Sequence, residues 1–75
     1  MEEIKLMKLT LGEKFTLLRQ QSGKTEEEVA AAVKKPVGTY RKMEGDFLYP
    51  TASMIKKVAK VYGMGYVELL EVGES

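Results

Sequence analysis

Hydrophobic and polar positions along this chain of 75 residues follow the period of a helix in three separate segments. Within each segment the apolar residues recur three or four positions apart, which places them on one helical face, and polar or small residues fill the remaining positions. The apolar sets are Leu11, Phe15, Leu17 and Leu18 in the first segment, Val29, Ala30 and Val33 in the second, and Met54, Ile55, Val58, Ala59 and Tyr62 in the third. The pattern predicts amphipathic helices that bury these faces in a common core.

Capping residues indicate where the helices begin and end. A threonine followed three residues later by a glutamate can form a capping box, in which each side chain accepts a hydrogen bond from the other residue's backbone N–H. Such pairs occur at Thr10 and Glu13 and at Thr25 and Glu28, and simpler caps stand at Gly23, Thr51, Gly63 and Gly65. We therefore expect an all-α fold with five short helices, packed as one compact domain over residues 10–73.

The first nine residues form a separate segment, in which apolar and polar residues alternate from Ile4 onward. The alternation is compatible with an extended arm or edge strand that takes part in dimer contacts. It is equally compatible with a frayed chain end that lies over the core. Residues 1–9 are therefore assigned as an N-terminal arm, for which both conformations remain alternatives.

Residues 25–44 predict two short helices separated by a tight break at Pro36. Proline lacks a backbone donor and restricts Lys35, so it is expected to stop the first helix and to serve as the first residue of the second. Two helices this short, joined by so few residues, must cross steeply. That is the geometry of a helix-turn-helix, whose second helix can present one face to a DNA major groove.

Composition excludes several classes of function. The chain has no cysteine and no histidine, which rules out disulfides and thiolate metal sites and removes the commonest general base. No nucleophile–base pair, carboxylate dyad or phosphate-binding glycine loop can be assembled, so we expect no enzyme, cofactor, metal or small-molecule substrate. The first residues lack an extended apolar run, which argues against a signal peptide or membrane span and makes a cytoplasmic protein the default. Net charge is only +1, so any case for nucleic acid depends on how the charges are distributed.

From Leu11 to Val72 the sequence resembles the lambda-repressor/Cro-type (Xre) helix-turn-helix family. The matching segments are LGEKFTLLRQQSG, TEEEVAAAV, TYRKMEG and KKVAKVYGMGYVELL. The resemblance implies a compact five-helix domain that binds double-stranded DNA. The spacing of Arg19 and Glu44 also fits the family, in which an arginine of the first helix pairs with a glutamate that ends the third. We interpret this pair as a structural ion pair that fixes how the helices dock.

The sequence departs from the family where DNA is usually contacted. Glu26 stands where family members commonly carry a glutamine that contacts a phosphate. Lys34 and Lys35 replace a glycine and an apolar residue in the turn. The positions that usually reach base edges carry Pro36, Val37 and Gly38, which offer no side-chain hydrogen bond, and the loop after the third helix, residues 45–49, lacks the usual basic residues.

Four positive charges on the turn and the third helix favour DNA contact nonetheless, although a solvated helix face is the alternative. We expect one set of residues to hold the DNA backbone and another to read bases. The backbone set is Thr25, Lys34, Lys35 and Thr39, and the reading set is Val37, Gly38, Arg41 and Lys42. The protein is accordingly interpreted as a sequence-specific transcriptional regulator of phage or bacterial type.

Six apolar residues in a loop and the last helix are candidates for a protein interface, or else belong to the core and the loop anchor. They are Phe47, Leu48, Tyr49, Tyr66, Val67 and Leu70. A homodimer is the economical form, because its paired third helices would read half-sites ~34 Å apart. The rival hypothesis is a protein-interaction module, such as an antirepressor or adaptor, which Glu26, the near-neutral charge and the apolar loop favour.

Overall fold

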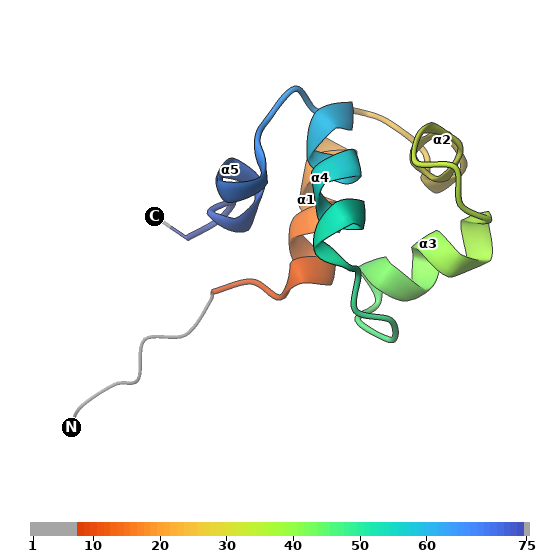
Figure 1. Cartoon of the computed structure of the whole chain (residues 1–75), viewed down its shortest axis with the longest axis horizontal. Coiled ribbons are helices and arrows are strands. Elements are labelled where there is room, and N and C mark those ends of the chain that lie inside the picture. Colours follow the sequence, from red (N-terminus) through yellow and green to blue (C-terminus); the bar gives the residue numbers. More distant parts are fainter. Residues whose placement is uncertain (1–7, 75) are drawn as a thin grey trace.

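The computed structural model describes residues 8–74 and confirms the all-α fold (Figure 1). The helices are α1 (Leu11–Gln21), α2 (Glu26–Ala32), α3 (Val37–Glu44), α4 (Ala52–Val61) and α5 (Tyr66–Leu70). The described part of the chain contains no strand, and most of the predicted arm, residues 1–7, lies outside it. None of the helices in residues 8–74 has the length and apolar character needed to cross a membrane.

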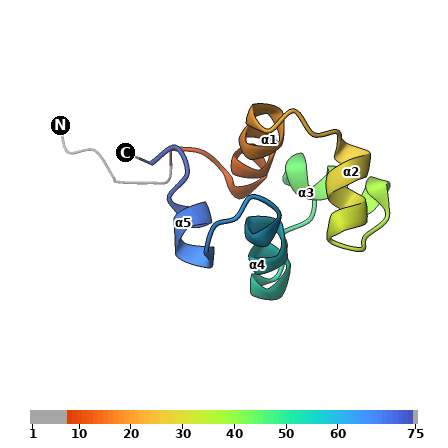
Figure 2. The same ribbon diagram turned by 90° about the horizontal axis from the view of Figure 1, so that it is seen from above.

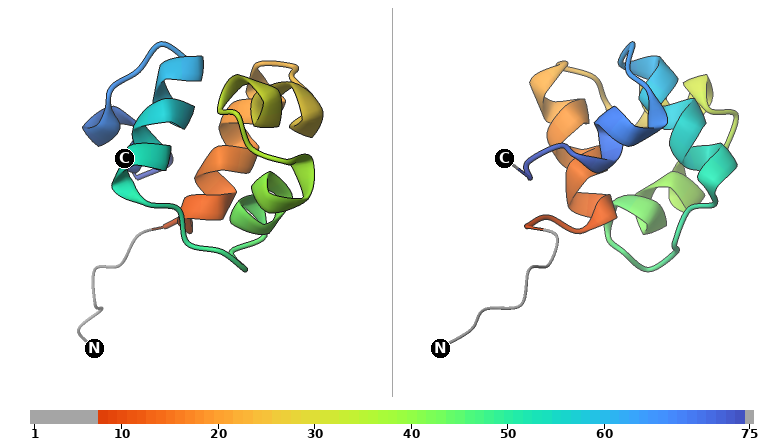
Figure 3. Two further views of the ribbon diagram at one scale, coloured as in Figure 1. Left: turned by 45° about the vertical axis from the view of Figure 1, so that its right-hand side comes forward. Right: turned by 60° about the vertical axis from the view of Figure 1, so that its left-hand side comes forward.

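Helices α1 and α4 lie on opposite sides of the middle of the molecule, with α5 beyond them at one end and α2 and α3 at the other (Figures 1 and 2). Helix α2 is seen end-on in Figure 1, whereas α3 runs across the view, so the two axes cross steeply. The views of Figure 3 show the same crossing from two further sides. The steep crossing expected from the short connection is therefore present.

Thirteen buried apolar residues from all five helices form the core, and they include nearly every position predicted from the periodicity. They are Leu11, Phe15, Leu18, Val29, Ala30, Val33, Tyr40, Met43, Met54, Ile55, Val58, Ala59 and Leu69. The rings of Phe15 and Tyr40 stack at its centre, with centroids 6.4 Å apart and planes within 2°. Leu17 and Tyr62 are only half-buried, contrary to expectation. Leu17 lies one residue, about 100°, round the helix from Leu18 and borders a shallow surface hollow instead.

The predicted capping boxes are both present. Thr10 N donates to Glu13 Oε1 at 2.9 Å, and Glu13 N donates to the Thr10 hydroxyl at 3.1 Å. The same reciprocal bonds join Thr25 and Glu28, at 2.7 and 3.1 Å. The hydroxyl of Thr51 accepts from the backbone of α4, as its N-cap position predicts.

The break between α2 and α3 differs from the prediction, because Lys34 rather than Pro36 ends α2. Lys34 adopts a left-handed conformation (φ 61°), and two backbone bonds, from Lys34 N to Ala31 O and from Lys35 N to Ala30 O, close the helix end. This is the Schellman motif that glycine usually makes. Pro36 is extended (φ −58°, ψ 145°) and is the N-cap of α3, not its first residue. The chain already changes direction at Lys34, two residues before Pro36, so the proline is not what ends α2.

Asp46 ends α3 in the same way, with φ 64°, and its carboxylate joins α3 to the start of α1. One carboxylate oxygen accepts from the Thr10 hydroxyl at 2.6 Å and the other from Gly12 N at 3.0 Å. A Cβ at position 12 would lie 2.6 Å from the carbonyl oxygen of Met43, so only glycine allows this approach of the two helices. The sequence had indicated Asp46 only as a loop residue.

Arg19 and Glu44 form a bidentate ion pair between α1 and the end of α3. The Nε–Oε2 distance is 2.7 Å and the Nη2–Oε1 distance is 3.2 Å, and the Thr16 hydroxyl donates to the same carboxylate at 3.1 Å. Burial by itself would raise the pKa of Glu44, but the hydrogen bond and charge of Arg19 outweigh it, so the pKa is lowered. The pair therefore stabilises the fold while Glu44 is ionised.

Lys14 is fully buried, which the sequence analysis did not anticipate. Its ammonium group donates to the carbonyl oxygen of Leu70, at the end of α5, and lies 3.0 Å from the Glu74 carboxylate. The hydrogen bond from Lys14 lowers the pKa of Glu74. Lys14 thus connects α1 to the end of the described chain.

We expect Lys34→Gly to raise the free energy of unfolding by about 0.5–1 kcal/mol, because glycine adopts a positive φ without the steric cost borne by lysine. Asp46→Gly is the matched comparison, since it relieves the same conformation but removes two hydrogen bonds to α1. That variant should lose about 1 kcal/mol. Urea unfolding followed by circular dichroism measures the free energy of unfolding of both variants. A change of the same sign in the two would contradict the roles assigned to the positive φ of Lys34 and to the Asp46 hydrogen bonds.

The Arg19–Glu44 pair predicts a pH dependence of stability. The lowered pKa of Glu44 means that its contribution is complete above the unfolded value of about 4.3 and is lost as pH falls through the folded value. Glu44→Gln should therefore cost about 2 kcal/mol near neutral pH, and the difference from the parent should shrink below about pH 4. Urea titrations at several pH values measure this difference. Glu71→Gln, at the exposed C-cap position after α5, is the control and should follow the parent throughout.

Candidate functional site

The outward face of α3 carries few side chains. Tyr40 and Met43 are buried, and because successive helical residues turn by about 100°, the opposite face presents Gly38, Lys42 and Gly45. A Cβ at Gly38 would meet no atom within 4 Å, so the backbone there is open. Lys42 is thus the one long side chain that stands directly outward, between two glycines.

Three of the other predicted residues of α3 lie at the edges of this face. Val37 is half-buried against the core, so only part of its side chain is exposed. Thr39 is half-buried and borders a shallow pocket of about 140 Å³. Arg41 lies on the opposite edge, toward α2, and its side chain is half exposed.

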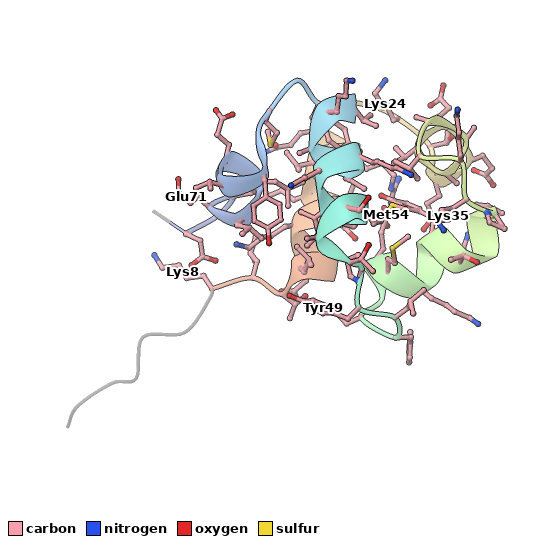
Figure 4. All side chains as sticks on the ribbon, in the orientation of Figure 1. Lys8, Lys24, Lys35, Tyr49, Met54 and Glu71 are labelled. Atoms are coloured by element: carbon pink, nitrogen blue, oxygen red, sulfur yellow. The ribbon has the colours of Figure 1, made fainter. Side chains whose placement is uncertain are left out.

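The turn lysines are exposed beside the start of α3. Lys34 occupies the left-handed position described above, and Lys35, labelled in Figure 4, borders the same pocket as Thr39. Among the ion pairs formed within residues 8–74, none includes Lys34, Lys35 or Lys42. Thr25 stands at the N-terminus of α2, where its hydroxyl oxygen already accepts from Glu28 N and its hydroxyl hydrogen is still available to donate.

Two carboxylates of α2 hold the guanidinium group of Arg41. Its Nε lies 2.8 Å from Glu26 Oε1, and its Nη2 lies 3.1 Å from Glu27 Oε2. The hydrogen bond that Arg41 donates to Glu26, followed by the charge of that carboxylate, raises the pKa of Arg41. The sequence does not reveal that Glu26 and Arg41 pair, because the pairing of residues 15 positions apart depends on the crossing angle of the helices.

The loop after α3 exposes its aromatic side chains. Phe47 is 84% exposed and Tyr49 76% exposed, and Leu48 is 42% exposed and lines the shallow pocket. The ring of Phe47 lies over Gly45, since a Cβ there would be 3.0 Å from it. The apolar surface of the loop therefore adjoins the C-terminal end of the outward face of α3.

The six candidate interface residues fall into two groups, one in the loop after α3 and one on α5. Helix α5 lies on the far side of α4 from α3 (Figures 1 and 2), and Tyr49 lies at the loop end of the molecule (Figure 4). On α5 only Val67 is prominently exposed, at 61%, whereas Tyr66 and Leu70 pack against the core. The ring of Tyr66 also lies beneath the Lys56 ammonium group, 5.9 Å from its centroid.

Acidic side chains are not clustered for metal binding. Within the described residues, no three His, Cys, Asp or Glu side chains are placed to hold a metal ion. The chemistry available at the outward face of α3 is therefore that of lysine and arginine donors, open backbone and apolar rings. Such groups bind a partner by hydrogen bonding, charge and packing.

Comparison with known proteins identifies the same region. A family model described as helix-turn-helix matches residues 17–69, which extend from within α1 to α5 and include α2, the turn and α3. No curated protein sequence matches the chain significantly.

Proposed function

The chain belongs to the Cro/repressor-type helix-turn-helix family, whose domain is a DNA-binding regulator domain, and from this premise we propose that it is a sequence-specific transcriptional regulator that places α3 in the major groove. The observation that carries the proposal is the outward face of α3. At Gly38 a Cβ would meet no atom within 4 Å, so the first turn of α3 has an open backbone that can approach base edges closely and bring Lys42, one turn further on, with it.

The reading residues are assigned by their position on α3. Lys42 stands directly outward and Arg41 at the edge, and both can donate to guanine O6 and N7. The exposed part of Val37 can contact a thymine methyl group, and Gly38 lets the backbone come close. These four residues determine which base pairs the domain prefers.

Phosphate contacts are assigned to the margins of the same surface. Lys34 and Lys35 lie at the turn before α3, Thr25 at the start of α2, and Thr39 at the pocket edge of α3. Basic and hydroxyl donors in these places fix the register on the duplex without reading its sequence. Glu26 opposes phosphate contact at the start of α2, so the affinity for random DNA is expected to be modest.

We further propose that the protein acts as a homodimer. The exposed loop of residues 45–49 adjoins the end of α3, so pairing through Phe47 and Tyr49 would bring two α3 helices to the same side of a two-fold assembly. Two half-sites about one helical turn apart, ~34 Å, are then read together.

A second candidate function is a protein-interaction module with weak or no DNA binding. Two observations favour it: the exposure of Phe47 and Tyr49, and the engagement of Arg41 by Glu26 and Glu27. In that case the aromatic loop would bind another protein, and the positive charge of Arg41 would be used within the domain. Measurement of DNA binding separates the two functions.

The DNA-binding proposal predicts two kinds of variant. Selection from a random DNA pool should yield a preferred site, and Lys42→Ala should weaken that site about tenfold or more while leaving random duplex nearly unaffected. Lys34→Gly removes a charge without adding strain, so it should weaken both DNAs alike and reduce the slope of log K against log salt by about 1. Fluorescence anisotropy at several salt concentrations measures these effects. A parent protein without salt-dependent binding would favour the interaction module instead.

The dimer proposal predicts that the parent protein has twice the monomer mass in solution at micromolar concentration. Tyr49→Ser combined with Phe47→Ser should shift it to monomer, because the main exposed apolar surface beside α3 is removed. Val67→Ser, on the separate surface of α5, is the matched control and should leave the dimer intact. Sedimentation equilibrium measures the mass, and dissociation by Val67→Ser alone would move the interface to α5.

A further inference from the structure

The contacts of Arg41 with α2 suggest that Glu26 and Glu27 do more than repel DNA phosphates. We propose that these two carboxylates are specificity determinants, which hold the Arg41 guanidinium with one edge directed at guanine. The inference rests on the proposed function, since it concerns how the α3 surface reads DNA.

The argument begins with the shape of the guanidinium group. Its five N–H donors form a rigid planar fork with a side edge, Nε and Nη2, and an end edge, Nη1 and Nη2. Glu26 accepts from Nε at 2.8 Å and Glu27 accepts from Nη2 at 3.1 Å, so the two acids occupy the side edge. No residue of the described part of the chain accepts a hydrogen bond from Nη1. We infer that Glu27 takes the Nη2 hydrogen that lies beside Nε, which leaves the end edge two parallel donors, one on Nη1 and one on Nη2.

Two parallel donors are what guanine requires. In the major groove guanine presents the acceptors O6 and N7, and bidentate binding of an arginine to both is the commonest specific base contact. An arginine held along its side edge meets this pair of acceptors with the end edge and loses less side-chain freedom on binding. Glu26 and Glu27 can supply this restraint because they are neighbours in the first turn of α2, where the helix dipole also favours their negative charge.

The arrangement should affect specificity and affinity in opposite directions. In solution the contacts of Arg41 are partly exposed and correspondingly weak, but they strengthen when the groove excludes water. Two carboxylates near the duplex simultaneously repel its phosphates, which lowers affinity for every sequence. Glu26 and Glu27 should thus improve discrimination at one guanine while they weaken binding to DNA in general.

The competing explanation is that the acids only mask Arg41. A mask would lower its contribution to binding without improving its choice of base. The two explanations agree that removing the acids strengthens binding to random DNA. They differ on whether the preference for guanine falls or is retained, and this difference is the basis of the test.

The experiment compares the parent protein with Glu26→Gln, Glu27→Gln, the combined Gln variant, Arg41→Ala, and the combined Gln changes in the Arg41→Ala background. Each binds three fluorescent duplexes by anisotropy: the site selected for the parent, the same site with adenine at the guanine that depends on Arg41, and random sequence. Gln retains the size of Glu, and melting by circular dichroism checks that each variant is folded. Glu71→Gln is the control for a lost negative charge far from α3, and should behave as the parent does.

We expect the parent to prefer guanine about tenfold at that position and Arg41→Ala to have no preference. The combined Gln variant should bind random duplex as well as or better than the parent, while its preference for guanine falls at least threefold. In the Arg41→Ala background the Gln changes should not alter the remaining preference. This non-additivity would place the effect of the acids on Arg41 itself.

Stronger binding of the Gln variants to all three duplexes with the preference unchanged would identify a mask and overturn the proposal. So would an unchanged preference in Arg41→Ala. Both outcomes leave the DNA-binding function intact. Failure of the parent protein to bind any duplex with salt dependence would instead remove the proposed function, and the proposal with it.

Discussion

The docking of α3 onto α1 is the constraint on which the rest of the structure depends. Three contacts at the C-terminal end of α3 determine it: the Arg19–Glu44 ion pair, the Asp46 carboxylate on the first turn of α1, and the close approach at Gly12. Each involves a different kind of interaction, and together they allow one rotation of α3 about its axis. Because this rotation buries Tyr40, it also decides which residues face outward. The composition of the candidate DNA surface is therefore a consequence of the core.

Local rules explain how much of the fold could be predicted from the sequence. Capping boxes and apolar periodicity involve residues within four positions of each other, so the helix starts at Thr10, Thr25 and Thr51 follow from sequence alone. The left-handed conformation of Lys34 does not, because nothing in its side chain favours a positive φ. It is adopted because two backbone bonds close α2 and because α3 must cross steeply. Local rules also do not name the partners of Lys14, because Leu70 and Glu74 come from the other end of the chain.

The same distinction applies to the candidate site. The charged residues were recognisable from the sequence, since four basic residues gather in a short segment. The partners of these residues were not recognisable. Glu26 and Arg41, for example, lie on two helices, and no local sequence pattern predicts the angle between them. For the same reason, the apolar composition shared by the loop after α3 and by α5 does not say whether the two lie on one face, and in the fold α5 lies on the far side of α4 from α3.

The acids of α2 show why residue type alone is a poor guide to a binding surface. Considered singly, Glu26 at the start of α2 repels a phosphate, and Arg41 attracts one. Once Arg41 is bound by Glu26 and Glu27, its positive charge is offset and attracts DNA little. Its remaining N–H donors, however, are held in a defined direction. The general attraction then falls to Lys34 and Lys35, which make no ion pair within residues 8–74. A surface of this kind gains little from charge and depends on the fit of α3 to its site, which is consistent with the open backbone at Gly38.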